Sequence, residues 1–363
     1  MTGASGQAQP AGARRSVFGR LDDGRVVEQV VLPGPGGMSV TLITLGAGIQ
    51  AIRTPDRGGR MADIVLGYDA PQEYLASRHY LGVSIGRYAN RIAHGRFTID
   101  GREYRVDTND GPNHLHGGAN GFDRQLWSID SMTSGAEAQV VFGHVSRDGD
   151  GGYPGELSVT ATYTLTMLGE LRLAYRATTS VPTIVSLTSH AYFNLSGDAA
   201  TGALDHRLTL HAGLYTPVDA TLIPTGERRR VAGTPFDFRQ SHAIADRMGD
   251  DDDQLRIARG YDHHHVLDGP AGTLRPAVRL EHPASGRALE IDTTAPGVQF
   301  YSGNSLDGAV PGKSGRRYRA GDGLCFEPQA FPDAPNRPDF PSARLDPGQL
   351  YENVKLFRFG VAR

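Results

Sequence analysis

The chain has 363 residues, of which 39% are hydrophobic and 21% charged, a composition typical of a folded globular protein. Its net charge of −3 lacks the basic excess that is typical of nucleic-acid-binding proteins. No apolar run is long enough to predict a membrane span. The single cysteine, Cys325, excludes an intrachain disulfide and a cysteine-rich metal site. We therefore expect a cytoplasmic protein that binds neither nucleic acid nor membrane.

The first 15 residues are rich in Gly and Ala, and no apolar signal segment follows them. This pattern predicts a disordered tail over residues 1–15. Neither a Pro- or Ser-rich linker nor a repeat divides the remainder, so residues 16–363 are expected to form one domain. The basic clusters at 228–230 and 316–319 and the acidic run at 250–253 are interpreted as solvated surface.

Alternation of apolar and polar residues dominates the middle of the chain. Residues 157–177 alternate on both sides of a turn at Leu168–Glu170, which predicts a β-hairpin with one buried face. Residues 97–106 predict a second hairpin, because Asp100-Gly101 suits a type I′ turn. Further strands are expected at 39–45, 139–144, 207–211, 288–293 and 355–359.

Helical pattern is scarce, with about two turns expected over 71–80 and one or two over 240–248. The 47 glycines and 22 prolines favour short strands joined by tight turns. We therefore predict an all-β fold, a large antiparallel twisted β-sandwich with few short helices. The sequence fits a monomer or a homodimer.

Polar residues gather in five segments where a strand pattern breaks, which is where a rigid sheet usually carries its binding groups. In the first, Asn90 and Arg91 lie between glycines and form either a turn with an ion pair or a binding pair. In the second, His114 and His116 would share a face of a strand. A metal is one interpretation of His-x-His, but the following residues 117–120 lack the carboxylate of a cupin motif.

In the third segment, His190 lies between apolar stretches and is followed by Tyr192, so it is either a satisfied core histidine or a catalytic one. In the fourth, the strand period places Asp262 on one face with His264, and His263 with His265 on the other. Three histidines in line make poor tetrahedral geometry, so Asp262 is the better functional candidate, as a hydrogen-bond acceptor.

In the fifth segment, Glu327 follows an apolar strand, and Pro328 is expected to stop the strand ladder. A carboxyl group among Phe326, Phe331 and prolines would be partly desolvated. Its pKa would then rise toward a value useful for proton transfer. The alternative is an exposed Glu on an edge strand.

Six segments in this order resemble the aldose 1-epimerase (galactose mutarotase) family: IGRYANRI, PNHLHGG, SHAYFNLSG, GYDHHHVL, PGVQFYSGN and EPQAFPDAPN. They extend from residue 82 to residue 336, and GQLYENVKLFRF closes the chain in a similar way. The resemblance implies a β-supersandwich that interconverts the α and β anomers of free aldoses such as D-glucose and D-galactose. It implies neither a metal nor a cofactor.

The resemblance assigns His190 as the catalytic acid and Glu327 as the catalytic base. It implies that the sugar-binding residues are Asn90, Arg91, His116, Tyr192, Asp262 and Gln299. The chain departs from the family pattern at three positions: Ser189 and His264 stand where Asn is common, and Pro328 stands where Thr is frequent. None of these departures removes a catalytic atom.

The expected reaction opens the sugar ring, with Glu327 taking the C1 hydroxyl proton and His190 protonating the ring oxygen. Three alternatives remain open: a glucose-6-phosphate 1-epimerase, a non-catalytic carbohydrate-binding β-sandwich, and a metal-dependent enzyme built on the histidines. The filled acid and base positions argue against the binding protein. A phosphosugar enzyme would need a basic pocket, for which the 228–230 cluster is available.

Overall fold

The computed structural model describes residues 12–135 and 137–362. Most of the predicted tail, residues 1–11, lies outside this range. Arg14 and Arg15, which the tail prediction also covered, begin strand β1 and pair with the neighbouring strand β2. These two residues therefore belong to a sheet and not to a tail.

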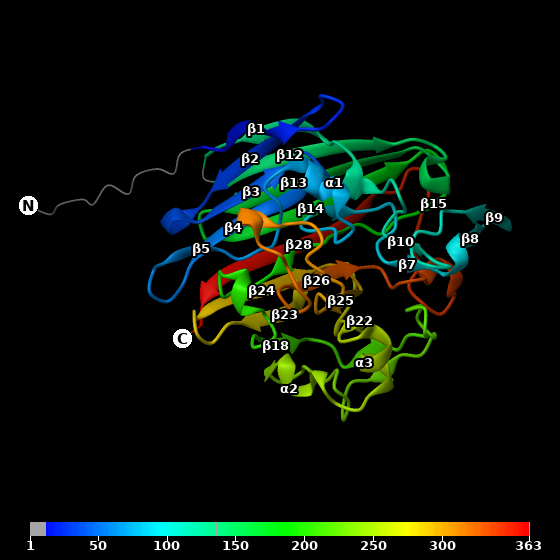
Figure 1. The fold of residues 1–363 in the computed structure, drawn as a ribbon. Helices are drawn as coiled ribbons and strands as arrows, with labels where there is room; N and C mark the ends of the chain where they lie inside the picture. The colour runs from blue at the N-terminus through cyan, green and yellow to red at the C-terminus, as the bar shows by residue number, and fades with distance from the viewer. Residues whose placement is uncertain (1–11, 136, 363) are drawn as a thin grey trace, which may run out of the picture.

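Three sheets make up most of the structure (Figure 1). The first has five strands in chain order: β1 Arg14–Arg20, β2 Val26–Pro33, β3 Ser39–Ile43, β4 Gly48–Pro55 and β5 Met61–Asp63. The second has nine, ordered β11 Ser128–Thr133, β12 Glu137–Ser146, β13 Leu157–Thr166, β14 Glu170–Thr179, β28 Tyr351–Val361, β24 Arg287–Thr293, β23 Arg275–Glu281, β18 Arg207–Leu210 and β21 His242–Ala243.

The third sheet has six strands, ordered β17 Tyr192–Phe193, β26 Leu324–Gln329, β25 Gly297–Tyr301, β22 Asp262–Val266, β19 Leu214–Thr216 and β20 Arg229–Arg230. Four short pairs complete the strands: β6 Ser84–Ile85 with β16 Thr188–Ser189, β7 Arg91–Ile92 with β10 His114–Leu115, β8 Arg96–Ile99 with β9 Arg102–Arg105, and β15 Thr183–Ile184 with β27 Arg344–Leu345. The predicted all-β fold is confirmed.

One apolar core joins the three sheets. It contains Leu42 of the first sheet, Phe142 and Leu173 of the second, and Phe300 of the third, all with almost no exposed surface. The nine-stranded sheet therefore forms the common layer on which the other two pack. Its central strand β28, red in Figure 1, crosses the middle of the molecule and reaches the third sheet.

The predicted hairpins are confirmed. Strands β13 and β14 pair in register on both sides of a turn at 167–169, with alternating burial. Strands β8 and β9 join through Asp100 and Gly101, whose φ angles of 50° and 78° are those of a type I′ turn.

Three short α-helices are present in the described residues, and no helix there is long and apolar enough to cross a membrane. Helix α1 (Pro71–Ala76) and helix α2 (Ala245–Met248) fall within the predicted segments. Helix α3 (Asp253–Ala258) was not predicted. The Asp252 carboxylate caps it by accepting hydrogen bonds from two backbone N–H groups, so part of the acidic run begins a helix.

Candidate active site

The register of three neighbouring strands brings the first site residues together. Gln299 on β25 lies opposite Glu327 on β26 and opposite His264 on β22. Directly paired residues point to the same face of a sheet, so Asp262, two residues from His264, shares that face. The Gln299 amide donates a 2.7 Å hydrogen bond to Asp262 Oδ1. Sheet register therefore fixes Asp262, Gln299 and Glu327 beside one another.

Strand β26 does not stop at Pro328, as the sequence led us to expect; it continues to Gln329. On one side, β17 pairs only with Leu324 and Cys325, whereas β25 pairs with β26 on the other side through Gln329. The missing N–H of Pro328 therefore faces the side on which the neighbouring strand has already ended. Glu327 lies inside the fold, only 2% exposed, and not at a solvated edge.

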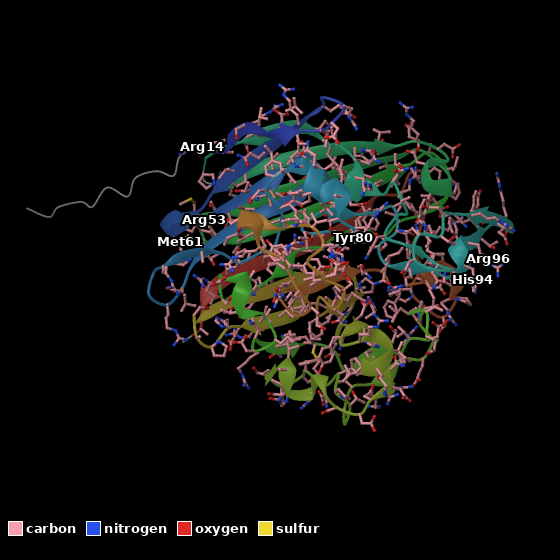
Figure 2. The ribbon with its side chains drawn as sticks, in the orientation of Figure 1. Arg14, Arg53, Met61, Tyr80, His94 and Arg96 are labelled. Carbon is pink, nitrogen blue, oxygen red and sulfur yellow. The ribbon has the colours of Figure 1, made fainter. Side chains whose placement is uncertain are left out.

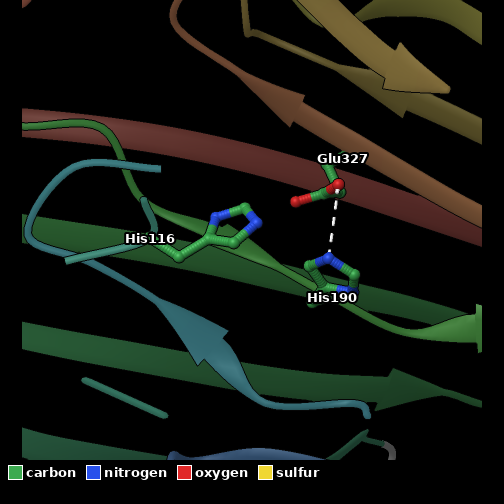
Figure 3. A group of neighbouring side chains, drawn as sticks. All are labelled: His116, His190 and Glu327. Atoms are coloured by element: carbon green, nitrogen blue, oxygen red, sulfur yellow. Dashed lines mark ion pairs between the residues drawn. The ribbon is translucent and has the colours of Figure 1, made fainter. Parts of the chain in front are cut away.

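His190 lies between strands β16 and β17, where its backbone N–H and C=O bond to Val83 and Gly82. Its ring Nε2 lies 3.6 Å from Glu327 Oε1, and the two side chains face each other in Figure 3. Its other nitrogen, Nδ1, lies 3.5 Å from the Sγ atom of the buried Cys325. The structure thus brings together an imidazole and a carboxyl group that are 137 residues apart in sequence.

Asn90 and His116 both adopt left-handed backbone conformations, with φ angles of 68° and 55°. The backbone N–H of Asn90 donates to His116 Nδ1 at 3.1 Å, so in the neutral ring the proton is on Nε2. Gly117 is required beside them, because a Cβ there would lie 1.7 Å from the Gly86 oxygen. His116 can therefore act as a hydrogen-bond donor toward the pair His190 and Glu327, beside which it lies in Figure 3.

Arg91 lies between Asp110 and Asp262. Its Nε bonds to Asp110 at 2.7 Å, and its Nη1 lies 3.6 Å from Asp262 Oδ2. The fork-like guanidinium is held between two carboxylates and is only 8% exposed. This arrangement fixes a cation in the site before any ligand arrives.

A cavity of about 600 Å³ opens onto these groups. Seven of the eight predicted site residues line it: Asn90, Arg91, His116, His190, Tyr192, Asp262 and Glu327. Gln299 is not among the lining residues and reaches the site only through its hydrogen bond to Asp262. The volume suits a small polar molecule such as a monosaccharide.

Other residues at this cavity were not predicted, among them Tyr80, Tyr301 and Asp110. The Tyr80 ring lies 4.8 Å from the His116 ring and 5.7 Å from the His190 ring, and Figure 2 labels it near the centre of the view. Tyr301 and Asp110 also line the cavity. Tyr301 was accessible to sequence reasoning, because it is two residues after Gln299 on one strand. No comparable pattern marks Tyr80.

Burial opposes charge on both members of the central pair. It raises the pKa of Glu327 to about 8, with Asp262 adding to the rise and Lys355 and Arg91 opposing it. Burial also lowers the pKa of His190 to about 3. The empty site therefore favours a protonated Glu327 beside a neutral His190. Burial raises the pKa of Asp262 as well, and Arg91 and Gln299 oppose this effect.

His116, His190 and Glu327 also have the residue types of a metal site, with one ligand atom from each within 4.8 Å of the others. The same atoms are arranged for proton exchange, since the imidazole and the carboxyl group face each other directly. A second group of this kind consists of Asp205, His206 and His282. Asp205 and His282 line a different cavity.

The three adjacent histidines divide as the strand period predicts. His263 and His265 lie against Tyr215 and Phe236 on one face of β22. His264 lies against Phe331 on the other face. All three are buried and packed against aromatic rings.

Comparison with known proteins agrees with this geometry. The sequence model of the aldose 1-epimerase family matches residues 28–358. The chain is 45% identical to galactose mutarotase of Homo sapiens over 97% of its own length and the full length of that protein. It is 38% identical to aldose 1-epimerase of Escherichia coli K12, covering 93% of this chain and 96% of that protein.

Solved structures show the same fold. An aldose epimerase homologue from C. elegans superposes with a TM-score of 0.85 at 31% identity, covering 92% of this chain and 99% of the other. Galactose 1-epimerase from Lactobacillus acidophilus gives 0.85 at 28% identity, with 97% and 99% covered. The chain belongs to the aldose 1-epimerase family of carbohydrate isomerases.

Proposed function

We propose that this enzyme interconverts the α and β anomers of free aldohexoses such as D-galactose and D-glucose, with Glu327 as base and His190 as acid. The observation that carries the proposal is the 3.6 Å separation between His190 Nε2 and Glu327 Oε1 in a sugar-sized cavity. The C1 hydroxyl and the ring oxygen are bonded to the same carbon. A base and an acid that serve both oxygens must therefore lie this close together.

Ring opening begins from a closed sugar with Glu327 ionised and His190 protonated. The carboxylate takes the proton of the C1 hydroxyl, the bond between C1 and the ring oxygen breaks, and the imidazolium protonates that oxygen. The aldehyde then turns about the C1–C2 bond. Attack on its other face, with the two protons returned, gives the opposite anomer and restores both side chains.

The open-chain state carries the proton on Glu327 and leaves His190 neutral. This is the distribution that burial favours, given the raised pKa of Glu327 and the lowered pKa of His190. The site therefore stabilises the open-chain intermediate relative to the ionised pair from which ring opening begins. Closure regenerates the carboxylate and the imidazolium, which attract each other across 3.6 Å in a buried setting.

The remaining residues hold the sugar through its hydroxyl groups. Asp262 accepts hydrogen bonds and is itself kept in place by Gln299 and Arg91. The His116 Nε2–H and the Arg91 guanidinium supply donors, and Asn90 contributes its amide. The Tyr192 ring lies 5.1 Å from the His190 ring and forms part of the apolar wall. The sugar is thus fixed while C1 changes configuration.

Polarimetry of fresh α-D-galactose and α-D-glucose tests the proposal. We expect the wild-type enzyme to accelerate the approach to equilibrium for both sugars, and His190→Asn to remove most of the acceleration. Binding of these sugars without any acceleration would identify a sugar-binding protein and contradict the proposal. Acceleration confined to glucose 6-phosphate would contradict it in favour of a phosphosugar epimerase.

A further inference from the structure

Lys355 is a buried amine that the proposed reaction does not use. It lies on β28, has no exposed surface, and is one of only two lysines among the 37 basic residues of the chain. The other, Lys313, pairs with Asp63 at 2.6 Å. No ion pair in the described residues includes Lys355. An ammonium group removed from water is costly unless its hydrogens are bonded, so its hydrogen bonds indicate its role.

These hydrogen bonds reach both catalytic segments. Lys355 Nζ donates to Thr188 Oγ1 at 2.6 Å and to Ser189 Oγ at 3.3 Å, and Ser189 immediately precedes His190. The Thr188 hydroxyl in turn donates at 3.0 Å to the carbonyl oxygen of Pro328, the residue after Glu327. One lysine therefore links, through a single hydroxyl, the two segments that carry the acid and the base.

Asn353, two residues before Lys355 on the same face of β28, makes a parallel link. Its Nδ2 donates to Leu187 O at 2.8 Å and to Pro328 O at 3.1 Å. The Pro328 carbonyl thus accepts from two side chains where β17 no longer supplies a partner. Strand β28, at the centre of the nine-stranded sheet, supports the site from behind.

We propose that Lys355 is a positioning residue that holds the segments of His190 and Glu327 at the separation that proton exchange requires. The inference rests on the proposed function, since it assigns the lysine to that acid–base pair. Lys355 touches no part of the cavity, so it acts only through Thr188, Ser189 and its charge.

The charge of Lys355 acts on the same pair. Glu327 on β26 and His190 after β16 both sense it, and the Tyr175 ring of β14 lies 5.5 Å from Nζ. Burial lowers the pKa of Lys355 well below its usual value, and Glu327 opposes this effect. In its protonated form the lysine holds the pKa of Glu327 below the value that burial alone would give. Removing the cation should therefore raise the pKa of Glu327 further.

Three variants separate positioning from general stability. Lys355→Met keeps the length of the side chain and removes its donors and charge. Thr188→Val keeps the shape of the threonine and removes the hydroxyl relay, whereas Thr188→Ser is the conservative variant that retains the relay. Folding is checked by circular dichroism and thermal unfolding, and kcat and KM for α-D-galactose are measured per folded molecule.

We expect Lys355→Met to lower kcat about 10–100-fold with KM within about threefold, the pattern of a misplaced catalytic pair. Thr188→Val should lower kcat in the same way, whereas Thr188→Ser should keep kcat near the wild-type value. The double variant Thr188→Val with Lys355→Met should lose no more kcat than Lys355→Met alone. The alkaline limb of the pH profile should move to higher pH in Lys355→Met.

Wild-type kcat in a folded Lys355→Met variant, or equal activity in Thr188→Val and Thr188→Ser, would overturn the inference. If Lys355→Met does not fold, the comparison of the two Thr188 variants still decides. Failure of the wild-type enzyme to accelerate mutarotation would instead overturn the proposed function, so the two failures are distinguishable.

Discussion

Within residues 12–135 and 137–362, two clusters each combine two histidines with one carboxylate, and they differ in burial and hydrogen bonding. In one, Glu327 is 2% exposed, and its Oε2 has no hydrogen-bond partner among the described residues. In the other, the Asp205 side chain is 62% exposed, with His206 Nδ1 at 3.0 Å from one oxygen and His282 Nε2 at 3.4 Å from the other. The hydrogen bond from His206 is the main cause that lowers the pKa of Asp205.

The difference shows that residue type alone does not make a proton-transfer site. Asp205 stays ionised and satisfied, so it has little tendency to exchange a proton near neutral pH. Glu327 is buried, its Oε2 has no hydrogen-bond partner among the described residues, and its pKa is raised toward the pH at which the enzyme would work. Burial and an unused hydrogen-bonding position distinguish Glu327, the proposed base, from Asp205.

Neutralising each carboxylate in turn should give the largest difference between the two clusters. We expect Glu327→Gln to lower kcat for α-D-galactose by roughly 10²–10⁴-fold, the range for a lost general base. The matched change Asp205→Asn should leave kcat within about twofold, since Asp205 lies outside the cavity. Polarimetry with both purified variants checks this. Equal losses in the two would remove the distinction between the clusters.

Asp262 is a third carboxylate for comparison, because its side chain is 14% exposed and has partners on both oxygens. Asp262→Asn should raise KM roughly tenfold with a smaller change in kcat, because a hydrogen bond to a charged group contributes about 1.5–3 kcal/mol. Initial rates at several sugar concentrations give both constants. A lower kcat at unchanged KM would place Asp262 in the proton-transfer machinery and not in sugar binding.

The raised pKa of Glu327 should also make the stability of the fold depend on pH. The folded pKa of Glu327 lies above its ordinary value of 4.5, so the unfolded chain loses this proton first. Stability therefore falls as pH rises from about 4.5 to about 8. We expect Glu327→Gln to raise Tm by about 1–3 °C more at pH 8 than at pH 5. A gain in Tm that is equal at both pH values would contradict the raised pKa.

Removal of metal ions should have the smallest effect. Both clusters have metal-ligand residue types, but the proposed reaction uses only protons. Activity after dialysis against EDTA should stay within about 20% of the untreated enzyme, with zinc addition giving no increase. Loss on chelation, restored by zinc, would support the metal-dependent alternative.

The sequence predicted the parts of the structure that obey local rules. Alternation predicted the hairpin of β13 and β14, and the Asp100-Gly101 pair predicted the type I′ turn of the hairpin of β8 and β9. The strand period also placed Asp262 and His264 on the same face of β22. Local pattern alone could not bring His190 to Glu327, because their contact depends on how separate sheets pack; the family resemblance assigned the pair.

The errors arose where tertiary structure overrides a local rule. Pro328 did not end its strand, because the neighbour it would have disrupted ends earlier. Lys355 illustrates a signal that was present: in Tyr351–Phe357, alternate residues Tyr351, Asn353, Lys355 and Phe357 share a face, so a charge occupies an otherwise inward-facing row. Apolar packing does not require polar residues at such positions. Asn353 and Lys355 therefore indicate a hydrogen-bonding role behind the proposed site.

The pH dependence of kcat/KM tests the central claim most directly. The pair must hold one proton, so activity should fall as pH rises through about 8, where Glu327 loses its proton, and fall again below about pH 4, toward the lowered pKa of His190. Polarimetry between pH 4 and 9.5, corrected for spontaneous mutarotation, measures this profile. A plateau up to about pH 8 followed by a decline is the predicted result. An undiminished rate at pH 9.5, with the chemical step limiting, would contradict the account.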